Sequence, residues 1–225
     1  MEGRGTDARQ KLVDAARDLF AEHGIEGVSL RQITRAAGQG NTSALQYHFG
    51  DRKALLRAVL EPHQQQVDAR REALLDELEA RGKAELRDLA SALVRPSAAM
   101  LHVEGGKAYL RIMAELNRDP GRFLRGRDRI HTGLQRWREM TQAIMPESVS
   151  PLHRRFAAIQ LCFSELARRA STRRRSDHRL FVSDLIDLTT GILSAPVSRE
   201  TQQLLEEREA IEAENRARDR IPGPE

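Results

Sequence analysis

The sequence predicts an all-α protein with a small N-terminal domain, residues 1–54, and a larger helical domain, residues 55–225. Apolar residues recur at spacings of three and four along most of the chain, which is the period of an amphipathic helix. Glycine and proline separate these segments, and no segment has the pattern of a strand. Hydrophobic residues make up 40% of the 225 positions, enough to form a core.

The N-terminal domain is organised around residues 29–57, SLRQITRAAGQGNTSALQYHFGDRKALLR. Ser29 is a suitable N-cap for a first short helix, and Asp51 for the helix that begins at Arg52. Two glycines bracket the turn before a second short helix. Two short helices joined by a tight turn are typical of the helix-turn-helix motif, which places its second helix in the major groove of DNA.

Longer helices are expected on both sides of this motif. The first runs from about Asp7 to His23 and covers the motif with one apolar face. The second begins near Arg52 and continues to about Ala80. We expect Pro62 to kink or break it, because proline lacks the N–H donor that a helix interior needs.

This N-terminal stretch resembles the tetracycline-repressor-like (TetR) family of transcriptional regulators. The resemblance covers roughly residues 8–60 and includes LFAEHGIEGVSL, RQITRAAG, a polar turn and QYHFGDRKALL in that order. Its most diagnostic part is Tyr47-His48-Phe49. Two features depart from the family pattern: the turn over residues 38–43 is one residue longer, and Gln46 replaces an aromatic residue.

Residue type and position predict the DNA contacts. The first turn of a recognition helix faces base edges, where Asn and Gln pair with adenine and a Thr methyl touches a thymine methyl. The predicted base-reading residues are Asn41, Thr42, Ser43 and Gln46. The resemblance implies phosphate contacts for Tyr47, His48 and Arg52, and position adds Ser29 and Arg31. Phe49 is assigned to the core, and Tyr47 could alternatively pack against Leu45 or Leu55.

The charge distribution agrees with a nucleic-acid partner. The whole chain carries a net charge of +4, and residues 29–57 hold five Lys or Arg but a single acid, Asp51. Residues 7–26 are acidic instead, with five acids and three bases. Positive charge on one element gives sequence-independent attraction to phosphates. A solvated helical face is the alternative interpretation of the same charges.

Residues 84–145 predict three or four irregular helices, with breaks at Pro96, Gly105-Gly106, Pro120-Gly121 and Pro146. The family resemblance implies a small-molecule pocket among them. As a group, soft and aromatic side chains suit an apolar cavity, although ordinary core packing is the favoured interpretation of any single one of them. The candidate lining residues are Met100, Tyr109, Met113, Phe123 and Trp137.

Two heptad-like helices follow Pro151, and each needs a facing partner. The resemblance implies a homodimer interface, a four-helix bundle formed by the last two helices of each subunit. An internal helix pair is the alternative, because heptad spacing does not say whose helix is the partner. The predicted interface residues are Phe156, Ile159, Phe163, Leu166, Phe181, Leu185, Leu188 and Ile192. A short final helix and a disordered end, about residues 217–225, complete the chain.

Composition argues against several other classes. The single cysteine, Cys162, excludes an internal disulfide framework, suits the cytoplasm and is expected in the core. No apolar run is long enough to span a membrane, and the polar N-terminus is not a secretory signal. The seven histidines show no metal-ligand spacing, and no phosphate loop or catalytic set stands out. We therefore expect neither an enzyme nor a bound cofactor or metal.

The sequence thus predicts a cytoplasmic, homodimeric DNA-binding regulator that recognises a palindromic operator in double-stranded DNA. Repression relieved by a small apolar ligand is the expected mode of action. Two alternatives remain: a helical dimeric adaptor that does not bind DNA, and an enzyme that uses the central pocket.

Overall fold

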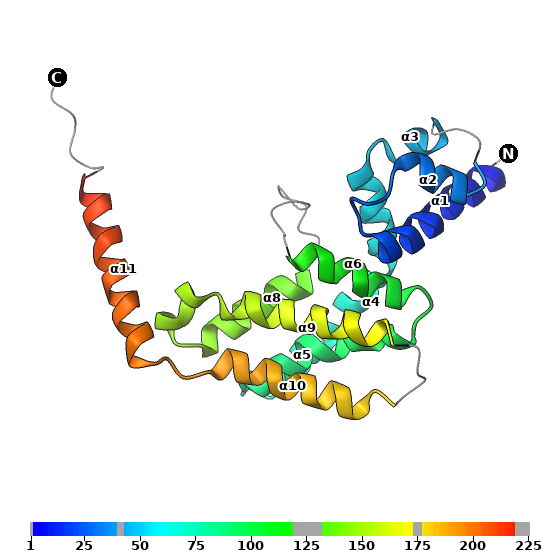
Figure 1. Cartoon of the computed structure of the whole chain (residues 1–225). Coiled ribbons are helices and arrows are strands. Elements are labelled where there is room, and N and C mark those ends of the chain that lie inside the picture. The colour runs from blue at the N-terminus through cyan, green and yellow to red at the C-terminus, as the bar shows by residue number, and fades with distance from the viewer. Residues whose placement is uncertain (1, 40–42, 119–131, 173–176, 219–225) are drawn as a thin grey trace, which may run out of the picture.

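The computed structural model describes residues 2–39, 43–118, 132–172 and 177–218, and it consists of helices (Figure 1). A small N-terminal group of helices lies at one end of an elongated bundle. No strand occurs within the described ranges. The described elements are α1 (Glu2–His23), α2 (Leu30–Ala36), α3 (Ser43–Phe49), α4 (Arg52–Ala80), α5 (Leu86–Ala98), η1 (Ala99–His102), α6 (Gly106–Arg118), α8 (Thr132–Ile144), η2 (Glu147–Leu152), α9 (Arg154–Ala170), α10 (Arg179–Ser194) and α11 (Arg199–Arg218).

The N-terminal helices close around a shared apolar core. Phe20 of α1, Ile33 of α2 and Leu45 of α3 are almost fully buried in it. Phe49, assigned to the core from the sequence, is buried at the end of α3, and the guanidinium of Arg9 lies 5.2 Å from its ring centroid. None of these short helices could hide its apolar face alone, so the three depend on one another and on α4.

Helix α4 joins the two parts of the molecule as one continuous element of 29 residues. Asp51 caps it: its Oδ1 accepts from the Ala54 N–H at 2.7 Å. Pro62 lies inside this helix, so of the two expected outcomes, a kink or a break, the break does not occur. A proline in a helix removes one backbone hydrogen bond, and the burial of Val59, Leu60 and Val67 on either side stabilises the helix across that gap.

The larger bundle is built on α5 and α6. Helix α6 packs against α9, while α5 packs against α4 and α10. Trp137 of α8 is completely buried, and its Nε1 donates to the Leu89 carbonyl of α5 at 2.7 Å. Arg136, on the outer side of α8, donates to Glu79, Glu72 and Asp76 of α4, and these acids raise the pKa of its guanidinium.

The predicted breaks in the central region are only partly correct. Gly105, in the left-handed conformation, precedes the start of α6 at Gly106, and Pro146 directly precedes η2. Pro96 instead lies within the last turns of α5, because the chain continues from there into the 3-10 turn η1. Residues 120–121 lie outside the described part of the chain.

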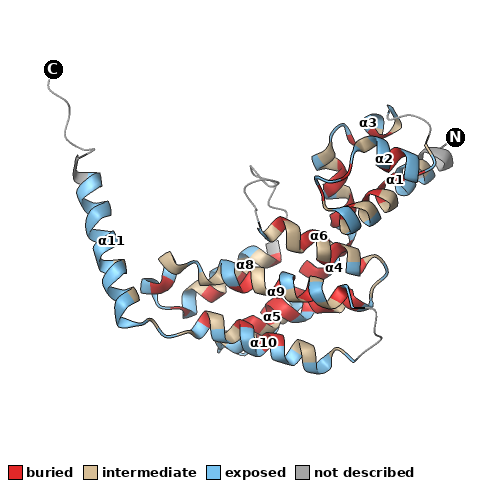
Figure 2. Ribbon diagram, in the orientation of Figure 1, coloured by how far each residue is buried: buried red, intermediate tan, exposed pale blue. Residues whose placement is uncertain are grey.

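Buried residues line the inner faces of the bundle, whereas α11 is exposed along most of its described length, with Thr201 and Leu205 partly buried (Figure 2). Leu204 and Ile211 of α11 are both open to solvent. No single helix within the described ranges is long and apolar enough to cross a membrane. Only α10 and α11 counted together, with a bend of 53° between them, reach that length and composition.

Trp137→Phe tests the link between α8 and α5. We expect the free energy of unfolding to fall by about 1–3 kcal/mol, because the variant loses the hydrogen bond to Leu89 and leaves a small cavity. Urea denaturation followed by circular dichroism measures this change. Tyr47→Phe on the exposed face of α3 serves as the control and should change stability by less than about 0.5 kcal/mol. Equal effects of the two substitutions would contradict the assignment.

Candidate nucleic-acid interface

The first helix of the motif, α2, begins with a complete capping box. The Ser29 hydroxyl accepts from the Gln32 N–H at 3.3 Å, and Gln32 Oε1 accepts from the Ser29 N–H at 2.7 Å. The same hydroxyl also donates to Gln32 Oε1 at 2.8 Å. Ser29 therefore fixes the start of α2, as its N-cap role predicted, and its exposed hydroxyl already has partners within the helix.

Helix α3 separates its apolar and polar residues onto two sides. Leu45 and Phe49 are buried against the domain core, whereas Gln46 and Tyr47 face solvent. Tyr47 is 86% exposed, so its side chain does not pack against Leu45 or Leu55, which was the alternative interpretation. An aromatic side chain that is left this open on a small domain is available to a partner.

The other predicted base and phosphate contacts lie near this exposed side. Ser43 is exposed at the start of α3, and His48 is half-buried with its ring edge-on to Tyr47 at a centroid distance of 5.2 Å. Asn41 and Thr42 lie outside the described residues. The DNA contacts of all these side chains stay predictions.

Exposed basic side chains flank α3. Arg31 and Arg35 project from α2, and Lys53 projects from the first turn of α4. Arg31 has the exposure that its predicted phosphate contact requires. Charges that stay in water can neutralise DNA phosphates without first breaking an internal ion pair.

Arg52 differs from its sequence-based prediction. Its two terminal nitrogens donate to the carbonyls of Ile25 and Val28 at 2.5 and 2.6 Å, and its guanidinium lies 6.0 Å from the Phe20 ring centroid. The side chain is half-buried. Arg52 thus holds the link between α1 and α2 against α4 through two of the five N–H donors of a guanidinium, and its phosphate contact stays a prediction.

The sequence that forms this motif matches the model of a known protein family. Residues 12–59 match the sequence model of "Bacterial regulatory proteins, tetR family". The match is confined to this N-terminal domain, which is therefore similar to the DNA-binding domain of that family.

Two curated relatives cover the same N-terminal region. The HTH-type transcriptional repressor AcnR of Corynebacterium glutamicum is 41% identical over 54 residues, which are 24% of this chain and 28% of that protein. The HTH-type transcriptional regulator SrpR of Pseudomonas putida is 34% identical over 62 residues, 28% of this chain and 29% of that protein. The chain thus matches less than a third of the length of these relatives. Both are regulators rather than enzymes, in agreement with the non-enzymatic function predicted from the sequence.

A solved structure extends the likeness in fold to the whole chain. The crystal structure of Mycobacterium smegmatis AmtR aligns with a TM-score of 0.52 and 20% sequence identity, covering 90% of this chain and 94% of that one. At this identity the comparison concerns the fold alone. The all-helical architecture with an N-terminal helix-turn-helix is therefore confirmed, as the sequence predicted.

The predicted pocket residues lie in the packed interior of the larger helical part of the chain. Met100, Tyr109 and Trp137 are at most 1% exposed, Met113 is also buried, and Phe123 lies outside the described residues. Tyr109 stacks on His63 with ring centroids 5.6 Å apart, and burial raises the pKa of its hydroxyl. These contacts show core packing for the four described residues. Their part in binding a ligand stays a prediction.

Sequence reasoning missed two buried polar side chains in this interior. Arg71 of α4 is almost fully buried and donates to Asp68 at 2.9 Å, and burial lowers the pKa of its guanidinium. His63 of the same helix bonds the Glu104 carbonyl at 2.9 Å. Cys162 is a core residue, as predicted, and burial raises the pKa of its thiol to about 12. Nothing in a linear pattern distinguishes these α4 residues from surface charges.

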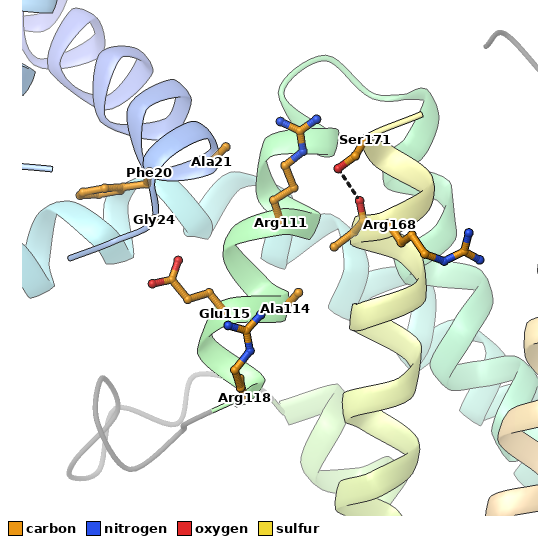
Figure 3. A pocket seen from close by; sticks show the side chains of 10 residues that line it. Phe20, Ala21, Gly24, Arg111, Ala114, Glu115, Arg118, Arg168 and Ser171 are labelled. Atoms are coloured by element: carbon orange, nitrogen blue, oxygen red, sulfur yellow. Dashed lines mark hydrogen bonds between the residues drawn. The ribbon is translucent and has the colours of Figure 1, made fainter. Parts of the chain in front are cut away.

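Sequence reasoning also missed an acidic residue, Glu115, which joins the N-terminal domain to the bundle. Both oxygens of Glu115, on α6, accept from the Ile25 backbone N–H at 3.0 and 3.1 Å. The two residues are 90 positions apart in the chain, so no sequence signal pairs them. Glu115 also lines a cleft of about 450 Å³ between α1, α6 and α9 (Figure 3).

The predicted dimer residues divide into two groups. Ile159, Phe163, Leu166 and Leu185 are at most 2% exposed in the single chain, so they have almost no surface left to give to a partner. For these four residues the interface prediction is corrected: they pack inside the bundle, where α9 contacts α6 and α10 contacts α5. The other four retain accessible surface and comprise Phe156, Phe181, Leu188 and Ile192.

Within the described residues, no group of three or more His, Cys, Asp or Glu side chains is placed to hold a metal ion.

Arg52 and Arg31 provide a matched pair of substitutions. Arg52→Ala should lower the free energy of unfolding by about 2 kcal/mol, because two charge-assisted hydrogen bonds to the α1–α2 link are lost. Arg31→Ala removes an exposed side chain and should cost less than about 0.5 kcal/mol. Urea unfolding monitored by circular dichroism distinguishes the two. A similar small loss for both would show that Arg52 does not hold the link.

Proposed function

We propose that this chain is a sequence-specific, DNA-binding transcriptional regulator that acts as a repressor. The observation that carries the proposal is the exposed side of α3, where Gln46 and Tyr47 face solvent within a domain that matches the tetR family. Exposed Arg31, Arg35 and Lys53 supply positive charge beside it. Together these groups of α2, α3 and the start of α4 offer base-edge hydrogen bonding and phosphate attraction within one small domain.

The protein binds a palindromic operator as a homodimer in the cytoplasm. Two copies of α3 then enter successive major grooves, about 34 Å apart along the DNA. The dimer contact uses the apolar residues that α9 and α10 leave accessible. Leu188 of α10 is 50% exposed and Phe156 of α9 is 37% exposed, so both side chains reach the surface of the bundle. Burying such side chains against a second copy removes apolar area from water.

Regulation acts through the junction between the two parts. Helix α4 runs across it, and Glu115 of α6 holds the Ile25 N–H at the end of α1. A small-molecule effector that displaces α6 would therefore move the N-terminal helices and alter the separation of the two copies of α3. A coupling of about 1–3 kcal/mol is typical of such responses and changes the affinity for DNA five- to 150-fold.

The two alternatives have weaker support. A dimeric adaptor without DNA binding does not account for the exposure of Tyr47 beside uncompensated basic residues. An enzyme in the central region would need an accessible reactive group, whereas Tyr109 and Cys162 are buried with raised pKa values. Neither alternative is favoured by the named relatives, which are regulators.

Selection of duplex DNA from a random library tests the proposal. We expect a palindromic sequence to be enriched by the purified chain, and we expect its affinity to fall steeply as salt increases, because phosphate contacts release counterions. Fluorescence anisotropy over a salt series measures this dependence. Absence of any enriched sequence would refute DNA reading and favour the adaptor.

Two variants separate base contacts from phosphate contacts. Arg31→Ala should weaken binding to all sequences alike and reduce the magnitude of the salt slope by about 2 for a dimer, one contact per half-site. Gln46→Ala should instead relax selectivity, with a loss of about 1–3 kcal/mol at one base pair of each half-site. Interchanged effects would reverse the two assignments.

The dimer face is tested by Leu188→Arg. We expect this variant to be monomeric in sedimentation equilibrium at concentrations where the original chain is dimeric, because an arginine cannot be buried there without a partner. Leu204→Arg is the control: the same substitution at an exposed leucine of α11 should leave the dimer intact. Dissociation by Leu204→Arg alone would place the interface on α11.

A further inference from the structure

We infer that the cleft between α1, α6 and α9 binds a small molecule carrying at least two anionic oxygens, from phosphate or carboxylate groups. Its lining includes Phe20 and Ala21 of α1 and Gly24 directly after that helix, and it contains Arg111 and Arg118 of α6. Occupancy of this site regulates the attached N-terminal domain, and that regulatory consequence rests on the proposed DNA-binding function.

The two arginines form the positive part of the site. Arg111 and Arg118 are seven residues apart on α6, so they occupy one face of the helix about 10 Å apart along its axis. Figure 3 shows Arg111 near Ser171 and Arg118 at the other end of the row, with Ala114 and Glu115 between them. This spacing suits a ligand with separated anionic groups.

Both guanidinium groups are available. Neither Arg111 nor Arg118 has an ion pair or hydrogen bond with any described residue, and the Nε of Arg111 is buried without an acceptor. A buried donor without a partner is uncommon in native proteins and is satisfied when a ligand supplies the acceptor. Carboxylate and phosphate oxygens match the geometry of the guanidinium fork.

Negative groups also lie at the cleft. Glu115 is the one acid among the lining residues, and its two oxygens already accept from Ile25 N–H. Arg168 also lines the cleft but is paired with Glu165 at 2.5 Å. The C-terminal ends of α1 and α9 each contribute about half a negative charge at most. With Glu115, these ends at most balance the charge of the two guanidinium groups. The preference for an anion therefore rests on the guanidinium N–H donors, which lack acceptors within the described residues and which only a ligand with acceptor oxygens can satisfy.

The size and position of the cleft fit a regulatory site. Its volume of about 450 Å³ lies within the range of small-molecule sites. One wall is the end of α1, and the other walls are α6 and α9, so a bound ligand touches both parts of the chain at once. It also lies beside the contact between Glu115 and Ile25, through which a shift of α6 reaches the N-terminal domain. This site contrasts with the apolar effector that the sequence favoured.

Calorimetric titration with inorganic pyrophosphate and, separately, succinate tests the site. Ionic strength is held constant with sodium chloride, so that general screening does not imitate binding. We expect saturable binding of at least one probe, and the tighter probe identifies phosphate or carboxylate as the recognised group. Arg111→Gln and Arg118→Gln should each weaken that binding at least about tenfold, since each removes a charge-assisted contact.

Two controls keep the result interpretable. Arg70→Gln removes an exposed positive charge from α4, away from the cleft, and should leave the dissociation constant unchanged. Arg118→Lys retains the charge and should bind the probe more tightly than Arg118→Gln. Circular dichroism verifies that each variant is folded. Absence of saturable binding, or equal binding by the Gln variants and the original chain, would overturn the site.

DNA anisotropy at saturating probe concentration tests the regulatory effect. The affinity of the selected operator should change at least fivefold in the original chain and stay constant in Arg111→Gln. Binding of the probe without any change in operator affinity would overturn the regulatory effect. Failure of the original chain to bind DNA without the probe would instead refute the proposed function, while the calorimetric result still decides whether the anion site exists.

Discussion

The structure depends on how the short link between α1 and α2 is held. Arg52 of α4 donates to the carbonyls of Ile25 and Val28, and Glu115 of α6 accepts from the N–H of Ile25. A cationic donor and an anionic acceptor thus satisfy opposite ends of the same backbone segment. Because irregular backbone next to a core must find hydrogen-bond partners, these two side chains fix the N-terminal helices on the bundle.

That fixed position determines which side of α3 is free. Leu45 and Phe49 are committed to the core shared with α1 and α2, so Gln46 and Tyr47 are left in solvent. The exposed side therefore belongs to a short helix that its opposite, buried side anchors to the core. A rigid element loses little conformational entropy when it binds, which suits recognition of a regular surface such as a DNA groove.

The same junction joins the N-terminal helices to α6 of the bundle. Glu115 belongs to the row of α6 residues that includes Arg111 and Arg118, so the group that holds the link is also part of the cleft wall. A ligand attracted by the two arginines would act on α6 within one or two helical turns of that contact. The distance between effector and joint is therefore short, and no long chain of packed side chains is needed to carry the effect.

The sequence by itself determined the helices, the boundaries of α4 and the motif, because helical periodicity, the caps Ser29 and Asp51 and the family pattern are local features. It could not decide which helix faces which. Phe163 and Leu188 share a similar heptad-like spacing, yet one is buried in its own chain and the other is half exposed. Arg52 likewise matched a phosphate-binding position but turns inward to a carbonyl 27 residues earlier. Only the tertiary structure settles such choices, since they depend on contacts between residues that are distant in the chain.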